Sequence, residues 1–183
     1  MKKSLINWVL SAAVVCTAHA KASDFTLDNT IFDVIGSTYN IDPLLLYSIA
    51  LTESATGAGG SKIAPHAYVY RTDSGAVYFD DLEKAKASLK KVLAETSNVD
   101  VGLMQINMHW HPQPDPTALL DPVANLSVAA AHLKTTLAST PDPIIGVGRY
   151  HSWRDELAVW YGQKVWQTYR NIQSFLTDVG GKK

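Results

Sequence analysis

The chain consists mainly of short stretches in which apolar residues recur with a helical period, separated by clear start and stop signals. Four stretches carry an apolar residue at every third or fourth position, and a fifth, 42–54, is apolar nearly all round. The first pattern predicts amphipathic helices, and the second predicts a helix buried in the core. Two of the stretches begin with Asp-Pro. This pair favours the start of a helix, because aspartate caps free amides and proline suits a first turn. The expected helices are 28–40, 42–54, 81–95, 121–138 and 155–178.

Residues 55–98 form an insert of a different kind. Two β-prone runs, Tyr68-Val69-Tyr70 and Val77-Tyr78-Phe79, flank the turn sequence Asp73-Ser74-Gly75. This pattern predicts a short hairpin, and because an isolated hairpin is unstable we expect it to lie on the helical body. The sequence therefore predicts a mainly α, α+β domain of about six helices with a small β-hairpin insert.

Length, charge and the N-terminus indicate a small exported protein. At 183 residues the chain is one domain, and a formal charge of −1 gives no basic surface for nucleic acid. Two lysines, an apolar run over 5–15 and Ala18-His19-Ala20 predict a signal peptide at 1–20, cut after Ala20 or Ala22. The mature domain, 21–183, is then expected in the periplasm, with no cysteine, because Cys16 lies in the signal, and no second apolar run long enough to span a membrane.

The candidate chemistry starts at Glu53, in the last turn of the buried helix 42–54. Such an acid is either a solvated or ion-paired helix end, or a proton donor whose pKa is raised by partial burial. Residues 99–107 are apolar enough to be buried, yet they contain Gly102 and the amides Gln105 and Asn107, which need hydrogen-bond partners. We interpret this segment as one wall of a cleft that faces Glu53.

Two histidines flank Trp110, at His109 and His111, and raise the question of a metal. Two ligands do not make a zinc site, and the sequence offers no cysteine or third clustered histidine beside them. We therefore expect neither a metal nor another cofactor.

Four motifs occur in one order along the chain: Glu53-Ser54, Gly102-Leu103-Met104-Gln105-Ile106-Asn107, Asn125-Leu126 and Arg149-Tyr150-His151-Ser152. In this order they resemble the lysozyme-like soluble lytic transglycosylase family over residues 41–169. Within that family the chain is most similar to the transglycosylases of conjugative elements, type IV secretion and pilus systems, which also have an insert before the Gly-Leu-Met-Gln segment. His151 stands where many members have asparagine, and either Ser61 or Ser74 is conceivable as the family's substrate-contacting serine.

The resemblance implies non-hydrolytic cleavage of the bond between N-acetylmuramic acid and N-acetylglucosamine in peptidoglycan, leaving an anhydromuramoyl end. Glu53 would be the catalytic acid and base, and Tyr150 would hold Glu53 or contact the acetamido sugar. The other implied substrate contacts are Ser54, Gly102, Met104, Gln105, Asn107 and His151, and a type IV secretion or pilus assembly is the implied partner.

A single-acid site fits such a reaction, since its nucleophile is the sugar's own C6 hydroxyl. Asp100 is the nearest acid in the sequence, but it alternates with Val99 and Val101 and so can face away from the cleft. The alternatives are a hydrolytic muramidase, which needs two carboxylates, and a catalytically silent peptidoglycan-binding scaffold module.

Overall fold

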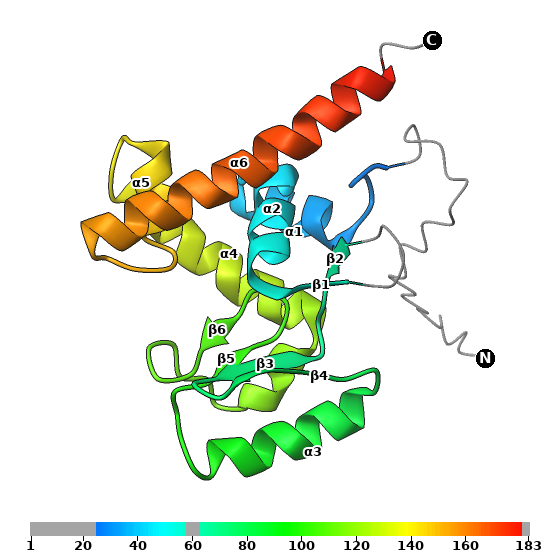
Figure 1. Cartoon of the computed structure of the whole chain (residues 1–183), viewed down its shortest axis with the longest axis vertical. Coiled ribbons are helices and arrows are strands. Elements are labelled where there is room, and N and C mark those ends of the chain that lie inside the picture. Colours follow the sequence, from blue (N-terminus) through cyan, green and yellow to red (C-terminus); the bar gives the residue numbers. More distant parts are fainter. Residues whose placement is uncertain (1–24, 58–62, 181–183) are drawn as a thin grey trace, which may run out of the picture.

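The computed structural model describes residues 25–57 and 63–180, so the predicted signal peptide and Ser61 lie outside the described residues. The mainly α fold is confirmed. The described part contains six α-helices: α1 (Ile31–Tyr39), α2 (Pro43–Ser54), α3 (Leu82–Leu93), α4 (Pro122–Ala138), α5 (Pro143–Gly148) and α6 (Asp155–Gly180). Figure 1 shows α2 inside a helical body, with the long α6 running across it and with α3 and the sheet at one end.

Aspartate-proline pairs begin three of these helices. The Oδ1 atom of Asp42 accepts a hydrogen bond from the Leu44 N–H at 2.8 Å, and that of Asp121 accepts one from Ala124 at 2.8 Å. The third pair, Asp142-Pro143, begins α5 in the same way. No separate helix is predicted at 142–148 from the sequence, although Asp-Pro is the same start signal as at residues 42 and 121. The helix has only six residues, which is too short for a convincing apolar period.

The first helix begins later than predicted. The sequence offers Asp28 or Asn29 as the capping residue of the helix predicted at 28–40, but Thr30 caps α1, and its Oγ1 accepts a hydrogen bond from the Asp33 N–H. Asn29 instead has a φ of 60°, in the left-handed region that asparagine tolerates. Asn40 ends the helix as expected, with a φ of 56°.

The predicted hairpin is present as part of a larger antiparallel sheet. Strands β3 (Val69–Thr72) and β4 (Gly75–Tyr78) form it, and β5 (Asp100–Val101) and β6 (Ile106–Asn107) extend it in the order β4-β3-β5-β6. Residues 99–107 are thus a second, very tight hairpin. A separate pair, β1 (Ala55–Gly57) and β2 (Ile63–Pro65), directly follows α2, and a 3-10 helix, Pro116–Leu120, precedes α4.

The hydrophobic core surrounds α2 and joins the two parts of the domain. Leu46 and Ile49 of α2 are fully buried, together with Met104 from the β5–β6 turn, Leu133 of α4 and Val165 of α6. This confirms that 43–54 is a core helix. Its last turn, and therefore Glu53, lies where the helical body meets the sheet. Across the described residues, no helix is both long enough and apolar enough to span a membrane.

Candidate active site

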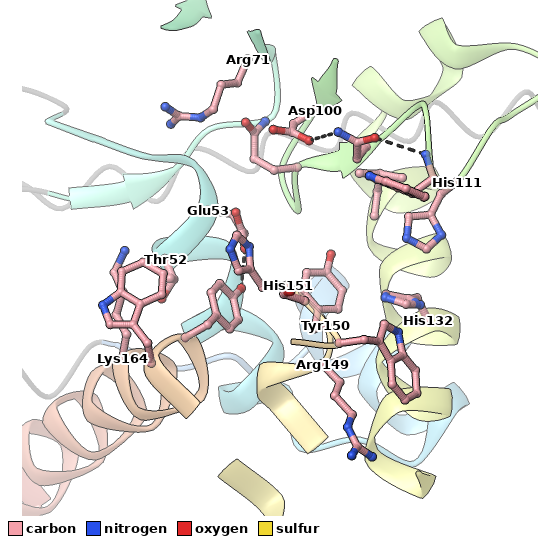
Figure 2. A pocket seen from close by; sticks show the side chains of 18 residues that line it. Thr52, Glu53, Arg71, Asp100, His111, His132, Arg149, Tyr150, His151 and Lys164 are labelled. Atoms are coloured by element: carbon pink, nitrogen blue, oxygen red, sulfur yellow. Dashed lines mark hydrogen bonds between the residues drawn. The ribbon is translucent and has the colours of Figure 1, made fainter. Parts of the chain in front are cut away.

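A pocket of about 930 Å³ opens where the helical body meets the sheet. Its two sides differ in origin, and Figure 2 shows Glu53, Tyr150 and His151 below Arg71 and Asp100. We call the first side the helical wall, made by Glu53, Tyr150, His151, Trp160, Tyr161 and Lys164. We call the second the sheet wall, made by Arg71, Asp100, Gln105, Ile106 and Asn107. Glu53 thus faces residues 99–107 across a pocket, as the cleft interpretation predicts.

Glu53 is held in a setting that favours its protonated form. The pKa of its carboxyl group is raised from 4.5 to about 7, mainly by burial and to a smaller extent by the negative charge of Asp100. The hydrogen bond from Tyr161 and the charges of Lys164 and Arg71 act in the opposite direction. A carboxyl group with a pKa near neutrality can both give and take a proton at physiological pH. The proton-donor interpretation of Glu53 therefore fits the structure better than that of a solvated helix end.

Tyr161 is the residue that contacts the Glu53 carboxyl group. Its hydroxyl donates a hydrogen bond to Glu53 Oε1, and its ring is buried and stacked on His151 at 4.9 Å. In the sequence, Tyr161 lies on the apolar stripe of the predicted helix 155–178, a position that indicates only a core residue. The ring of Tyr161 is indeed buried, as its place on the stripe indicates. A helical period cannot show that the hydroxyl reaches the end of another helix.

Tyr150 has a different partner from the one considered first. Its hydroxyl donates a hydrogen bond to the Met104 carbonyl oxygen at 2.8 Å, which ties the helical wall to the β5–β6 turn. Burial raises the pKa of Tyr150 well above its ordinary value, so the hydroxyl stays protonated and remains a donor. Tyr150 was expected either to hold Glu53 or to contact the acetamido sugar. The first of these roles is filled by Tyr161, not by Tyr150.

The β5–β6 turn depends on Gly102 and on Asn125 of α4. Gly102 has a φ of 76°, and a Cβ atom there would lie 2.3 Å from the Leu119 carbonyl oxygen. The Asn125 amide accepts from the Met104 N–H at 2.8 Å and donates to the Val101 and Leu119 carbonyls at 2.8 and 3.0 Å. Glycine is thus required by both the conformation and the close approach of neighbouring backbone.

Three residues that we expected to contact substrate are buried behind the pocket wall. Gly102 and Met104 belong to the turn just described, and the Met104 side chain is fully buried, so it does not contact a ligand in the cleft. The hydroxyl of Ser54 is used inside the protein: it lies 2.8 Å from the Leu103 carbonyl and accepts from the His66 N–H at 3.1 Å. We therefore revise Ser54, Gly102 and Met104 to residues that build the site.

Gln105, Asn107 and His151 do line the pocket, as their sequence positions suggested. Gln105 has a φ of 47° and donates from Nε2 to the Gly102 carbonyl at 2.9 Å, while its Oε1 atom is buried with no partner among the described residues. Asn107 accepts the His109 and Trp110 N–H groups on Oδ1. Their contacts with substrate stay predictions.

Asp100 faces the pocket, so the single-acid expectation is wrong as a description of the site. Residues directly opposite in an antiparallel sheet share a face, and Asp100 is opposite both Arg71 and Asn107. Val101, Tyr70 and Ile106 occupy the other face and are buried. From its alternation with Val99 and Val101 we expected that Asp100 could face away from the cleft, and this expectation is wrong because Asp100 lines the pocket. The alternation could not show that the opposite face of the sheet borders the pocket that contains Glu53.

Aromatic side chains surround the mouth of the pocket. Trp110, Trp153 and Trp160 all line it and are 73%, 60% and 55% exposed, respectively. Large flat rings at the edge of a groove suit the apolar faces of sugars. His111 and His132 lie in ring contact at 4.4 Å within the same pocket. No group of three or more potential metal ligands occurs in residues 25–57 and 63–180.

The comparisons with known proteins agree with this fold and this pocket, which together define a lysozyme-like domain with a buried acid at the end of its core helix. The family model of the transglycosylase SLT domain matches residues 30–173, which is most of the chain. The chain therefore belongs to the transglycosylase SLT family, whose members are lytic transglycosylases acting on peptidoglycan. Neither the curated proteins nor the solved structures yielded a match.

Proposed function

We propose that this protein cleaves the glycosidic bond between N-acetylmuramic acid and N-acetylglucosamine in peptidoglycan without consuming water. The observation that supports this best is the Glu53 carboxyl group, which stays protonated up to about neutral pH inside an open pocket. Membership of the SLT family supports the same class of reaction. A group that must first give a proton and then take one back works best when its pKa is near the working pH.

The reaction would proceed in two proton transfers through Glu53. Glu53 donates its proton to the glycosidic oxygen as the bond from that oxygen to the anomeric carbon breaks. The C6 hydroxyl of the muramoyl residue then attacks its own anomeric carbon and returns its proton to Glu53, which closes the anhydro ring. The hydroxyl of Tyr161 orients the carboxyl group throughout, because it holds Oε1. No water enters the product, and Glu53 ends the cycle protonated as it began.

Product analysis of digested peptidoglycan tests this reaction directly. Mass spectrometry of the fragments is expected to show anhydromuramoyl ends, which are 18 mass units lighter than the reducing ends that hydrolysis leaves, about one water molecule per cleavage. Asp100 in the pocket gives the hydrolytic muramidase a specific structural argument, and reducing ends alone would establish it. No release of fragments by folded protein would favour the silent peptidoglycan-binding module.

The place where the protein acts, and the apparatus that it serves, are proposed on separate grounds. The signal peptide pattern at 1–20 supports export to the periplasm, where peptidoglycan is the available substrate. Service to a conjugation, type IV secretion or pilus apparatus rests on the sequence resemblance alone. Deletion in a strain without redundant transglycosylases should then impair transfer, secretion or pilus assembly, and unchanged transfer would remove this part of the proposal.

A further inference from the structure

Two cationic side chains line the pocket, one from each wall. Arg71 follows Tyr70 on β3, and because Tyr70 is buried in the core, Arg71 lies on the other face of the strand, which borders the pocket. Lys164 lies one turn after Tyr161 on α6 and lines the pocket with it. Both cations are exposed, so a ligand entering the pocket can reach them from either wall.

The pocket differs in character on the two sides of Glu53. In the view of Figure 2, Arg71 and Lys164 lie on one side of Glu53, and His111 and His132 lie on the other. The two imidazole rings are in contact at 4.4 Å, and burial lowers the pKa of both, so they are uncharged at neutral pH. A ligand that lies along the pocket therefore meets positive charge at one end and uncharged rings at the other.

Neither cation is used inside the protein. Arg71 and Lys164 make no hydrogen bond or ion pair with any residue that the structure describes. Lys164 is placed by the ring of Trp160, one turn earlier on α6, with its ammonium 5.5 Å from the ring centre. Arg149, which also lines the pocket, shows the contrast: its guanidinium donates to the hydroxyl and carbonyl oxygens of Ser139 at 2.9 and 3.1 Å. Arg149 serves the fold, whereas the other two cations are left for a ligand.

The charges of these two cations act throughout the pocket. Both lower the pKa of Glu53, against the effect of burial. Arg71 also lowers the pKa of Asp100, and Lys164 lowers that of His151. The proposed reaction begins with a protonated Glu53, which both charges oppose, so tuning the acid does not account for their presence. Attraction of an anionic ligand does account for it.

We propose that Arg71 and Lys164 together form an anion clasp that binds a carboxylate carried by a muramoyl residue of the peptidoglycan strand. This inference rests on the proposed function, which supplies peptidoglycan as the ligand. The N-acetylglucosamine residues of the strand are neutral, whereas each muramoyl residue bears a lactyl group. The carboxylate is that of the lactyl group itself on a bare strand, or one belonging to the attached peptide on a substituted strand.

The two side chains suit this ligand in different ways. A planar guanidinium can donate two parallel hydrogen bonds to one carboxylate, and an ammonium adds a point charge from the opposite wall. Exposed ion pairs are individually weak, so the clasp adds selectivity more than affinity. It favours strands that contain muramic acid over neutral oligomers of N-acetylglucosamine, which otherwise present the same backbone and the same acetamido groups.

Calorimetry in a Glu53→Gln background tests the anion clasp by binding alone. This background is expected to leave its ligand uncut, and it lacks the carboxyl group whose pKa the two cations affect. Three ligands of equal length are compared: a neutral N-acetylglucosamine oligomer, a glycan strand stripped of its peptides, and a strand that keeps them. We expect at least one anionic ligand to bind about 10-fold more tightly than the neutral oligomer, with the difference shrinking as salt is added.

Arg71→Gln combined with Lys164→Gln, added to this background, should abolish the preference and leave binding of the neutral oligomer unchanged. The matched control combines Lys134→Gln with Arg170→Gln, which removes the same two charges from exposed positions outside the pocket and should keep the preference. Arg71→Lys combined with Lys164→Arg keeps both charges and should retain most of the preference, which a role in packing alone would not produce. Unfolding curves show that each protein compared is folded.

The two anionic ligands identify the source of the carboxylate. A preference for the stripped strand assigns the clasp to the lactyl carboxylate, and a preference for the substituted strand assigns it to the peptide. Equal affinity of the two glutamine variants and their background for all three ligands would overturn the clasp. An equal loss of affinity for all three would also overturn it, because the two side chains would then only shape the groove.

The proposed function can fail separately. If wild-type protein makes anhydromuramoyl ends but shows no preference that depends on Arg71 and Lys164, the clasp is wrong and the proposed function stands. If wild-type protein makes only reducing ends, and the preference is lost in the double glutamine variant, the proposed reaction is wrong and the clasp stands. A protein that neither cleaves peptidoglycan nor binds any of the three ligands would contradict both.

Discussion

On the helical wall, Glu53 lies beside aromatic rings and receives one hydrogen bond from the buried Tyr161, whereas on the sheet wall Asp100 is held by an amide next to an arginine. Burial raises the pKa of both carboxyl groups, to about 7 for Glu53, while at Asp100 the hydrogen bond from Asn107 and the charges of Arg71 and His151 counteract it. The same functional group therefore differs in proton affinity across one pocket. What decides the difference is the kind of element that carries each residue. A helix end beside the core places its carboxyl group against aromatic rings, while one face of a sheet presents a row of polar groups.

Removing the acid of the helical wall should have the largest effect. Glu53→Gln is expected to reduce the release of peptidoglycan fragments by about 10³-fold, because glutamine neither donates nor accepts a proton at this position. The matched control is Glu95→Gln, an exposed acid just beyond the end of α3. A zymogram and quantified fragment release measure both. Substantial turnover by a purified, folded Glu53→Gln protein would contradict the assignment of Glu53 as the catalytic acid and base.

The next largest effect should be on the stability of the turn that supports the sheet wall. Gly102→Ala adds a Cβ atom 2.3 Å from the Leu119 carbonyl at a φ of 76°, so we expect unfolding free energy to fall by roughly 3 kcal/mol. Gly75→Ala is the control, since Gly75 also has a positive φ, of 115°, but nothing lies within 4 Å of its added Cβ. That variant should lose only about 1 kcal/mol from backbone strain.

Denaturant titration compares the two glycine variants. A larger loss in Gly102→Ala than in Gly75→Ala isolates the contact with the Leu119 carbonyl from the cost of the left-handed conformation. Equal losses would mean that backbone strain alone explains both, and that the close approach to the 3-10 helix is relaxed at little cost.

The two tyrosines of the helical wall allow a finer test. Tyr161→Phe removes the hydrogen bond that lowers the pKa of Glu53, so the alkaline limb of the pH profile should move to higher pH. Turnover should also fall about 10- to 100-fold, since the carboxyl group loses its fixed orientation. Tyr150→Phe removes only the bond to the Met104 carbonyl and should weaken stability without moving that limb. If the limb moves in Tyr150→Phe instead, the roles of the two tyrosines are reversed.

The two walls also differ in how far they follow from sequence. Glu53 and the turn around Gly102 were predictable, because a helix stop and an apolar run with a glycine and two amides are local signals. The hydroxyl of Tyr161 and the direction of Asp100 were not, because both depend on what another element places opposite them. For the same reason the buried hydroxyl of Ser54 was mistaken for a substrate contact: its partners, Leu103 and His66, are distant in the sequence.

The smallest predicted effect is a gain in stability for Glu53→Gln, the same substitution that is expected to remove activity. Because the pKa of Glu53 rises from 4.5 to about 7 on folding, the native state binds more protons than the unfolded state between those values. Wild-type stability should therefore decrease as the pH rises through this window, whereas Glu53→Gln has no such dependence. A shift of this size corresponds to at most roughly 3 kcal/mol, and partial solvent contact reduces the expected gain of Glu53→Gln at pH 8 to about 1 to 2 kcal/mol.

Thermal or denaturant unfolding of wild type, Glu53→Gln and Glu95→Gln at two pH values measures this gain. At a pH near 4.5 or below, both states of wild type are protonated at Glu53, so the variant should show little advantage there. An advantage for Glu53→Gln that is equal at both pH values, or that Glu95→Gln shares, would mean that Glu53 is not held in a charge-penalising setting. The helical wall would then hold its carboxyl group no differently from the sheet wall, and the acid assigned to catalysis would have to be chosen on geometry alone.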